Sequence, residues 1–283
     1  MENISRRTAI KTALVGGAAL AVSGLEAANP AKKKKAETKE PLKGNVRHSV
    51  SKWCFGDYPL EEFCGICKNI GIESIELLDP KDWPVVQKHG LTVAMCQGAG
   101  LGIDRGFNDP KLHDELVASY EAVIPQVAAA GLTNLICFSG KRNGLTDLQG
   151  WENCEKGLKR LMPLAEKHNV VLTMELLNSV GHKDYQCDHT VWGVELCRRV
   201  GSPNFKLLYD IYHMQIMEGN IIENIQKYHE YFSHIHTGGN PGRAEIDETQ
   251  ELYYPAIMKA LVETGLHQDP PNADIWQPLL NTL

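Results

Sequence analysis

The segment Tyr209–Met217, YDIYHMQIM, follows the apolar run Phe205–Leu208. Apolar and aromatic residues that give way to polar side chains are typical of a buried strand with functional groups at its carboxyl end. Because side chains alternate along a strand, Leu208 and Asp210 share one face, so an apolar layer would end in a carboxylate. His213 follows three residues later, in an expected turn. The short pattern alone also fits an aspartate that caps the next helix.

Two neighbouring segments show the same arrangement. Val170–Asn178 is nearly all apolar, and Glu175 ends one of its faces, while Phe232–His236 ends in a histidine. Glu175, Asp210 and His236 are therefore predicted at the ends of three successive strands. Two carboxylates and an imidazole form a ligand set for a divalent cation such as Mg²⁺, Mn²⁺, Co²⁺ or Zn²⁺. Without a cation, a buried pair of carboxylates would repel each other and lose hydration.

The segment 46–283 alternates strand and helix patterns, and its length suits one α/β domain of the (β/α)8 TIM barrel type. Strands are expected at 48–55, 72–78, 91–97, 133–138, 170–178, 205–212 and 232–237. Helices are expected at 60–70, 83–88, 110–130, 148–168, 190–200, 220–230 and 255–264. This alternation implies parallel crossovers within a closed or doubly wound sheet.

Residues 1–28 have the features of an export signal. The pair Arg6 and Arg7 precedes the apolar stretch 13–25, and small residues follow it. This order favours the twin-arginine route and a periplasmic location. The apolar stretch is too short for a stable membrane span. Residues 29–45 contain a run of lysines and few apolar side chains, which predicts a charged, solvated linker.

The chain has eight cysteines, spread over a barrel-sized domain. That distribution is unlike a disulfide scaffold. Cys64 and Cys67 have redox spacing but lie in an expected helix, and no second pair completes a zinc site. We expect the cysteines to act mainly as small buried apolar residues.

The stretches around the three strand ends resemble the hydroxypyruvate isomerase group of the xylose isomerase-like TIM barrels, a superfamily of sugar isomerases and epimerases. They read MELLN, YDIYHMQIMEG and HIHTGGNPGR, at residues 174–178, 209–219 and 234–243. The resemblance extends over residues 46 to 265. Where some hydroxypyruvate isomerases show H-x-Q, this chain has His234-Ile235-His236, a difference toward the epimerase branch.

The resemblance implies that Glu175, Asp210 and His236 bind one divalent metal ion and that His213 and Arg243 contact the substrate. It further implies proton transfer beside the carbonyl of a small keto sugar or hydroxy-keto acid, through an enediolate. The metal would acidify the C–H bond, and Glu175 is the candidate proton-transfer group.

Other polar residues are predicted at the active face of the barrel, where the carboxyl ends of the strands lie. Those expected to line a substrate pocket are Trp53, Glu76, Gln97 and His182. Lys141 and Arg142 are candidates to pair with an acid group of the substrate, or else they are ordinary surface charges.

In the family, the last strand ends in a second glutamate that binds the metal and transfers protons, and this sequence shows no counterpart. Residues 266–274 include Pro270 and Pro271, and proline donates no ladder hydrogen bond. We therefore expect the eighth strand to be missing or irregular, an open seam between strands one and seven, weakened metal binding and isomerase activity below that of a complete relative. The remaining candidate carboxylates in the preceding loop are Glu245, Glu248 and Glu251.

Two other functions remain open. One is a catalytically impaired, carbohydrate-binding descendant of this family. The other is a zinc phosphodiesterase of the endonuclease IV type, which would need more histidine ligands and a basic groove, and the net charge of -6 disfavours a nucleic-acid partner. The expected partner is a small carbohydrate or hydroxy-keto acid, and the sequence leaves homo-oligomer formation open.

Overall fold

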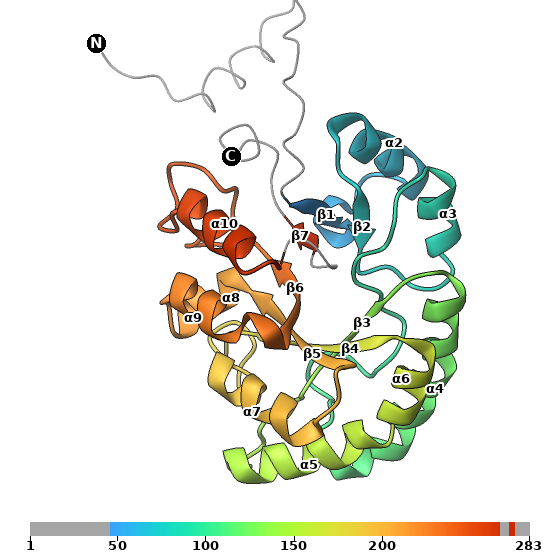
Figure 1. Ribbon diagram of the computed structural model, residues 1–283, viewed down its shortest axis with the longest axis vertical. Helices are drawn as coiled ribbons and strands as arrows, with labels where there is room; N and C mark the ends of the chain where they lie inside the picture. Colours follow the sequence, from blue (N-terminus) through green and yellow to red (C-terminus); the bar gives the residue numbers. More distant parts are fainter. Residues whose placement is uncertain (1–45, 267–271, 275–283) are drawn as a thin grey trace, which may run out of the picture. The chain divides into compact units, whose positions relative to one another are not determined.

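The computed structural model describes residues 46–266 and 272–274. Its strands form one sheet in the order β2-β1-β7-β6-β5-β4-β3, and every pairing is parallel. The strands are β1 (Arg47–Ser51), β2 (Ser74–Glu76), β3 (Asn134–Cys137), β4 (Val171–Glu175), β5 (Phe205–Asp210), β6 (Phe232–His236) and β7 (Asn272–Asp274). Helices lie outside these strands (Figure 1), as the predicted TIM barrel requires.

The segment 91–97, predicted as a strand, joins the sheet through isolated parallel bridges instead. Thr92 bridges to Ser74, and Cys96 bridges to Leu78 and to Leu135. One reason for the irregular ladder is that the Ala94 N–H donates to the Ser74 side chain, at 2.7 Å, rather than to a strand carbonyl. These bridges connect β2 to β3, so each of the eight segments has two neighbours.

The helices follow the predicted order. They are α2 (Leu60–Ile70), α3 (Trp83–Lys88), α4 (His113–Ala129), α5 (Asp147–Lys159), α6 (Met162–His168), α7 (Thr190–Val200), α8 (Ile211–Met217), α9 (Ile221–Tyr228) and α10 (Tyr254–Glu263), with short 3-10 turns η1 (Lys52–Phe55), η2 (Pro110–Leu112) and η3 (His229–Tyr231). The single helix predicted at 148–168 is two helices. Pro163 lies in the first turn of α6, where its missing N–H breaks no helical bond.

The turn predicted around His213 is wrong, because helix α8 begins directly after Asp210. Asp210 is the N-cap of α8, and its Oδ1 accepts the backbone N–H of His213 at 3.1 Å. Only Oδ1 takes part in this capping bond. The other carboxylate oxygen, Oδ2, lies near His236 and Arg243. Asp210 therefore ends β5 and caps α8 at the same time.

Apolar residues fill the centre of the ring of strands. Met95, Ile136 and Leu208 form one small buried cluster, separate from the larger core that includes the helices. Leu208 therefore faces the interior, and Asp210 follows it on the same face, as the strand period predicts. The apolar layer forms the floor of the polar site at the strand ends.

The cysteines are all free thiols, and only Cys54 among them is exposed. Cys64 and Cys67 lie buried in α2, and burial raises the pKa of Cys67 to about 12. A thiol with so high a pKa is a poor nucleophile, which agrees with the predicted packing role. In the part of the chain that the structure describes, no helix is both long and apolar enough to cross a membrane.

The prediction of an open seam is wrong, because β7 fills the gap between β1 and β6. This three-residue strand lies between β1 and β6, with Ala273 paired to both His48 and Ile235. The two prolines precede the paired residues rather than interrupting them, so every residue of β7 keeps a backbone N–H. The eighth strand is short and irregular, as predicted, but it fills the seam. The predicted export signal and linker lie outside the described residues.

Candidate active site

The three predicted metal ligands meet at adjacent strand ends. Glu175 ends β4, Asp210 ends β5 and His236 ends β6, and one ligand atom from each lies within 4.8 Å of the others. His236 Nδ1 is 3.3 Å from Glu175 Oε1 and 3.6 Å from Asp210 Oδ2. All three side chains are buried. The parallel register causes this convergence, because Asp210 pairs directly with His236 across β5 and β6.

The donor set fits a divalent cation. Two carboxylates and one imidazole are hard to borderline donors, and here they face each other inside the protein. Burial opposes ionisation of Asp210, but His213, His236 and Arg243 outweigh it and lower its pKa well below the usual range. Burial likewise opposes charge on His236, and the neighbouring carboxylates raise its pKa well above the usual value. The cluster therefore favours positive charge between its carboxylates.

Glu76 does not line the substrate pocket, contrary to the prediction. It is completely buried, and its Oε2 lies 2.7 Å from His234 Nε2 and 3.2 Å from His236 Nε2. The Ser49 hydroxyl donates to its Oε1 at 2.6 Å. Burial opposes ionisation of Glu76, but both histidines lower its pKa well below the usual range.

Glu76 instead orients His236. A carboxylate that accepts the Nε2–H of His236 leaves Nδ1 directed toward Glu175 and Asp210, where a bound cation would take the place of the Nδ1 proton. Glu76, His234 and His236 also have the spacing of a three-ligand cation site. Their short direct contacts already pair the carboxylate with both imidazoles, so we interpret them as support for the first cluster.

Two of the three candidate metal ligands, Glu175 and His236, line a cavity of about 300 Å³, which we call the inner cavity. Its polar lining includes four of the residues predicted to contact substrate, namely Gln97, His182, His213 and Arg243, together with Trp53, Glu175 and His236. Its apolar lining consists of Leu77, Ile103, Ile136, Phe138 and Leu177. Sequence reasoning missed the apolar lining, because such residues at strand ends have the same pattern as core residues.

Arg243 lies between Asp210 and His213. It donates to Asp210 Oδ2 at 2.8 Å, and one of its nitrogens lies 3.3 Å from His213 Nε2. Its guanidinium lies 5.3 Å from the ring centres of both Trp53 and Tyr212. Burial opposes its charge, but Asp210 outweighs this and raises the pKa of Arg243. The guanidinium is therefore held in place and charged at the cavity wall.

His213 is fixed by a residue that sequence analysis did not identify. The backbone N–H of Asn178 donates to His213 Nδ1 at 3.2 Å, and burial lowers the pKa of this histidine. A neutral ring whose Nδ1 accepts carries its proton on Nε2, so Nε2 and the Arg243 guanidinium 3.3 Å away are both donors and can share one acceptor, such as a substrate oxygen. The ring of His182 lies edge-on, with its centre 5.4 Å from that of His213.

Lys141 and Arg142 take no part in the inner cavity. Lys141 Nζ lies 2.6 Å from Asp104 Oδ2, and Arg142 contacts Asp147 at 2.5 Å and Asp188 at 3.3 Å. Neither residue belongs to the cavity lining. These pairs favour the alternative of ordinary surface charge, because both cations already contact carboxylates of neighbouring loops.

Comparison with known proteins identifies the class. Residues 65–270 match the family described as xylose isomerase-like TIM barrel, and this chain belongs to that family. The match includes β2 to β6 and all three candidate metal ligands.

Relatives of known name lie within the isomerases and epimerases. The chain is 25% identical to hydroxypyruvate isomerase of Escherichia coli over 218 residues, or 73% of this chain and 84% of that protein. It is 30% identical to 2-oxo-tetronate isomerase of Cupriavidus necator, over 36% of this chain and 38% of the relative. A D-psicose 3-epimerase of Enterocloster bolteae is 31% identical, over 39% and 40% of the two chains.

Solved structures share the fold. An AP endonuclease of family 2 from Brucella melitensis superposes with a TM-score of 0.73 and 23% identity, over 82% of this chain and 93% of the other. A D-psicose 3-epimerase crystallised with D-fructose gives a TM-score of 0.66 and 14% identity, over 82% and 85% of the two chains. At these sequence identities, the structural similarity shows that the fold is shared and does not show a shared reaction.

Proposed function

We propose that this protein is a metal-dependent sugar isomerase, with epimerisation as the related alternative, that acts on a small keto sugar or hydroxy-keto acid. The observation that carries the proposal is the convergence of Glu175, Asp210 and His236 beside a cavity lined by His213 and Arg243. A divalent cation held by the first three residues would polarise adjacent substrate oxygens and acidify the C–H bond between them. The named relatives, which are isomerases and an epimerase, support this class.

The residues of the chain have distinct roles in this proposal. Glu175 lies in the cavity wall, where it can accept the acidified proton and return it to the neighbouring carbon. His213 Nε2–H and Arg243 donate to substrate oxygens as negative charge develops on them. The apolar lining limits water in the cavity, so those hydrogen bonds act in a medium of low polarity.

The number of carboxylates favours isomerisation. Glu175 is the only carboxylate among the described residues of the inner cavity. One base on one face of an enediolate suffices to move a proton between adjacent carbons, whereas inversion at one carbon needs a second donor on the opposite face. For epimerisation, His182, whose ring lies beside that of His213 in the same lining, would be the candidate second proton donor.

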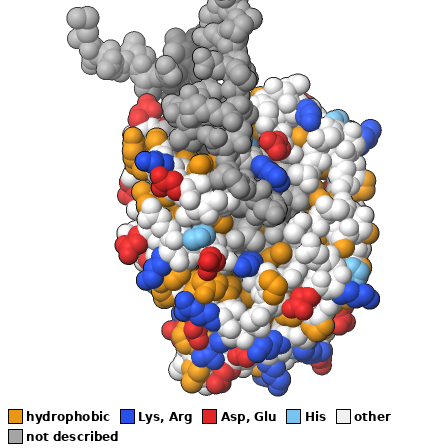
Figure 2. Space-filling view, viewed as in Figure 1, with side chains coloured by type: hydrophobic (Ala, Val, Ile, Leu, Met, Phe, Trp, Pro, Cys, Tyr) orange, Lys and Arg blue, Asp and Glu red, His pale blue; other side chains and the backbone are white. Residues whose placement is uncertain are grey.

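The phosphodiesterase alternative has less support. On the face shown in Figure 2, acidic and basic side chains alternate without a basic stripe. Binding to a nucleic-acid backbone requires such a stripe. In addition, His234 and His236 both contact the Glu76 carboxylate. His234 is therefore not free to serve as a further metal ligand of the kind a zinc cluster needs.

The test combines metal analysis with solvent deuterium exchange. The purified chain is incubated in D₂O with hydroxypyruvate or D-fructose, and NMR follows deuterium at the carbon beside the carbonyl. We expect exchange by the parent chain, and its loss in Glu175→Gln with reduced bound metal. Glu62→Gln, which changes an exposed carboxylate on α2, is the control and should behave as the parent. Full metal occupancy in a Glu175→Gln, Asp210→Ala double variant would exclude this ligand set.

A further inference from the structure

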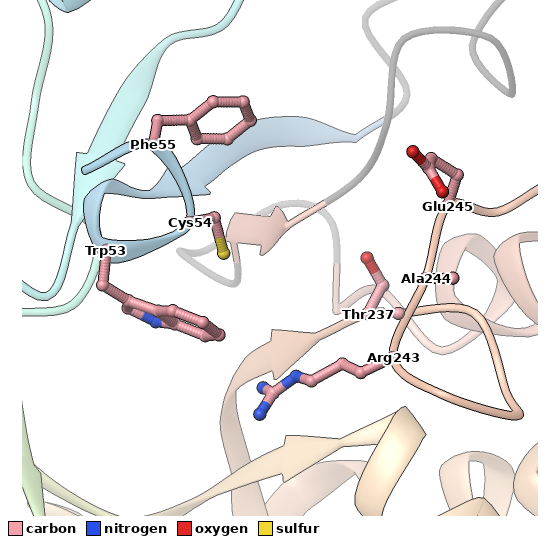
Figure 3. A pocket seen from close by; sticks show the side chains of 8 residues that line it. Trp53, Cys54, Phe55, Thr237, Arg243, Ala244 and Glu245 are labelled. Atoms are coloured by element: carbon pink, nitrogen blue, oxygen red, sulfur yellow. The ribbon is translucent and has the colours of Figure 1, made fainter. Parts of the chain in front are cut away.

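A second cavity, of about 370 Å³, adjoins the inner one, and we call it the outer cavity. Trp53 and Arg243 line both cavities, so the two spaces meet at this pair. Figure 3 shows Trp53, Cys54 and Phe55, which follow β1, facing a second group of residues that follows β6. That second group consists of Thr237, Gly238, Arg243, Ala244 and Glu245.

We propose that the outer cavity binds a second sugar ring, so that the substrate is a keto sugar joined to another glycosyl unit. This inference rests on the proposed function and specifies the substrate class of the same site. The reacting carbonyl would lie over Glu175, and the glycosyl unit would extend past Trp53 and Arg243 into the outer cavity. An unsubstituted triose acid at Glu175 has no group to place there.

Trp53 provides the surface for a ring. Its side chain is 57% exposed although it lies in a cavity wall, and Arg243 lies 5.3 Å from its ring centre. Exposed tryptophan beside a polar cavity suits a ligand that has both an apolar face and a polar edge. A pyranose ring has these properties, because its C–H groups form a flat face and its hydroxyls surround it.

Thr237 provides an independent indication of a polar ligand. It is 8% exposed, and its hydroxyl has no hydrogen-bond partner among the described residues. A buried hydroxyl without a partner is unfavourable, so a ligand hydroxyl that reached it through a rotation of the Thr237 side chain toward the outer cavity would stabilise it. Glu245 adds an exposed carboxylate to the same lining, which can accept further sugar hydroxyls.

The experiment compares two ketoses that differ by one ring. Isothermal titration calorimetry of the full chain, with Mg²⁺ present, measures the binding of D-fructose and of isomaltulose, in which a glucosyl ring is attached to fructose. We expect isomaltulose to bind about tenfold more tightly, from burial of one sugar face against the indole. Equal affinity, or tighter binding of D-fructose, would overturn the proposal.

Variants locate the preference. Trp53→Ala should bring the ratio of the two affinities close to one, and Trp53→Phe should keep most of it, which excludes misfolding as the cause. Thr237→Val and Glu245→Gln should each lower the ratio in part. Tyr253→Ala removes an aromatic ring that is 72% exposed and outside both cavity linings, and should keep the parent ratio. An unchanged ratio in Trp53→Ala would refute the assignment.

The two measurements test the outer-cavity proposal and the isomerase proposal independently. Calorimetry needs no turnover, while deuterium exchange in the same two sugars reports the reaction. A preference for isomaltulose without exchange would support the outer cavity and contradict the isomerase proposal. Exchange with equal affinities would support the isomerase and contradict the outer cavity.

Discussion

Replacing Glu76 with glutamine tests whether this buried residue orients the metal ligand His236. Glutamine has the same shape, so the amide oxygen can still face the two histidines, and the Ser49 hydroxyl can accept from the amide nitrogen. The change then removes charge while the contacts at 2.7 Å to His234 and 3.2 Å to His236 keep a partner. Loss of such supporting interactions typically lowers metal affinity about 10- to 100-fold, or about 1.4 to 2.8 kcal/mol.

We expect Glu76→Gln to fall at the lower end of that range, because shape and hydrogen bonding are retained. Glu76→Ala should reach the upper end. It should also lower the free energy of unfolding by about 3 to 5 kcal/mol, since it leaves two buried imidazoles without their carboxylate.

The assay is a Co²⁺ titration followed by calorimetry and by visible absorption, which reports the geometry of the bound ion. Glu73→Gln, an exposed carboxylate just before β2, is the matched control and should not change either signal. Thermal melting of the metal-free chain separates a role in folding from a role in metal binding. The reasoning is refuted if Glu76→Gln binds Co²⁺ with parental affinity and spectrum while Glu175→Gln loses both.

Three further predictions address export, acid stability and packing. We propose that the protein is exported, so changing Arg6 and Arg7 to lysine should retain the precursor in the cytoplasm; cell fractionation would show this, and normal export would contradict the twin-arginine assignment. Burial lowers the pKa of His48 to about 4, so the unfolded state binds its proton first as pH falls below 6.5; stability should drop by about 2 kcal/mol between pH 7 and pH 5, and urea unfolding of His48→Asn should show a smaller drop. Gly193→Ala would place a methyl carbon 2.9 Å from both terminal carbons of Leu207 and should cost about 1 to 3 kcal/mol in the same assay, with an unchanged midpoint as the contrary result.

Several helices could be predicted to the residue, because local signals set their ends. Helices α2 and α7 have the predicted bounds, and each is followed by a glycine, Gly71 or Gly201, with left-handed backbone. The φ angles of these glycines, 91° and 70°, are costly for other residues. The helix α8 was missed because its first residues have the same apolar and aromatic composition as the end of β5.

The candidate metal ligands could also be predicted, since strand period and chain order place them without knowledge of the rest of the fold. Glu76 could not be assigned correctly in the same way. Its partners His234 and His236 are on β6, far along the chain, and only closure of the ring brings β2 and β6 within contact distance. Arg243 reaches Asp210 from a loop position with a φ angle of 51°, which no local pattern predicts.

The short eighth strand connects these two observations. Glu76 is on β2, which pairs with β1; β1 pairs with β7, and β7 pairs with β6, which carries His236. Among the described residues, the pairing of β6 with β7 is limited to Ile235 and Ala273, so the contact of Glu76 with His236 spans a sparsely paired part of the sheet. The irregular β7 therefore acts on the candidate metal site through its backbone, because β7 connects β1 and β2 to β6. The orientation of His236 depends on ring closure as well as on its own strand, whereas Glu175 and Asp210 lie on the extensively paired strands β4 and β5.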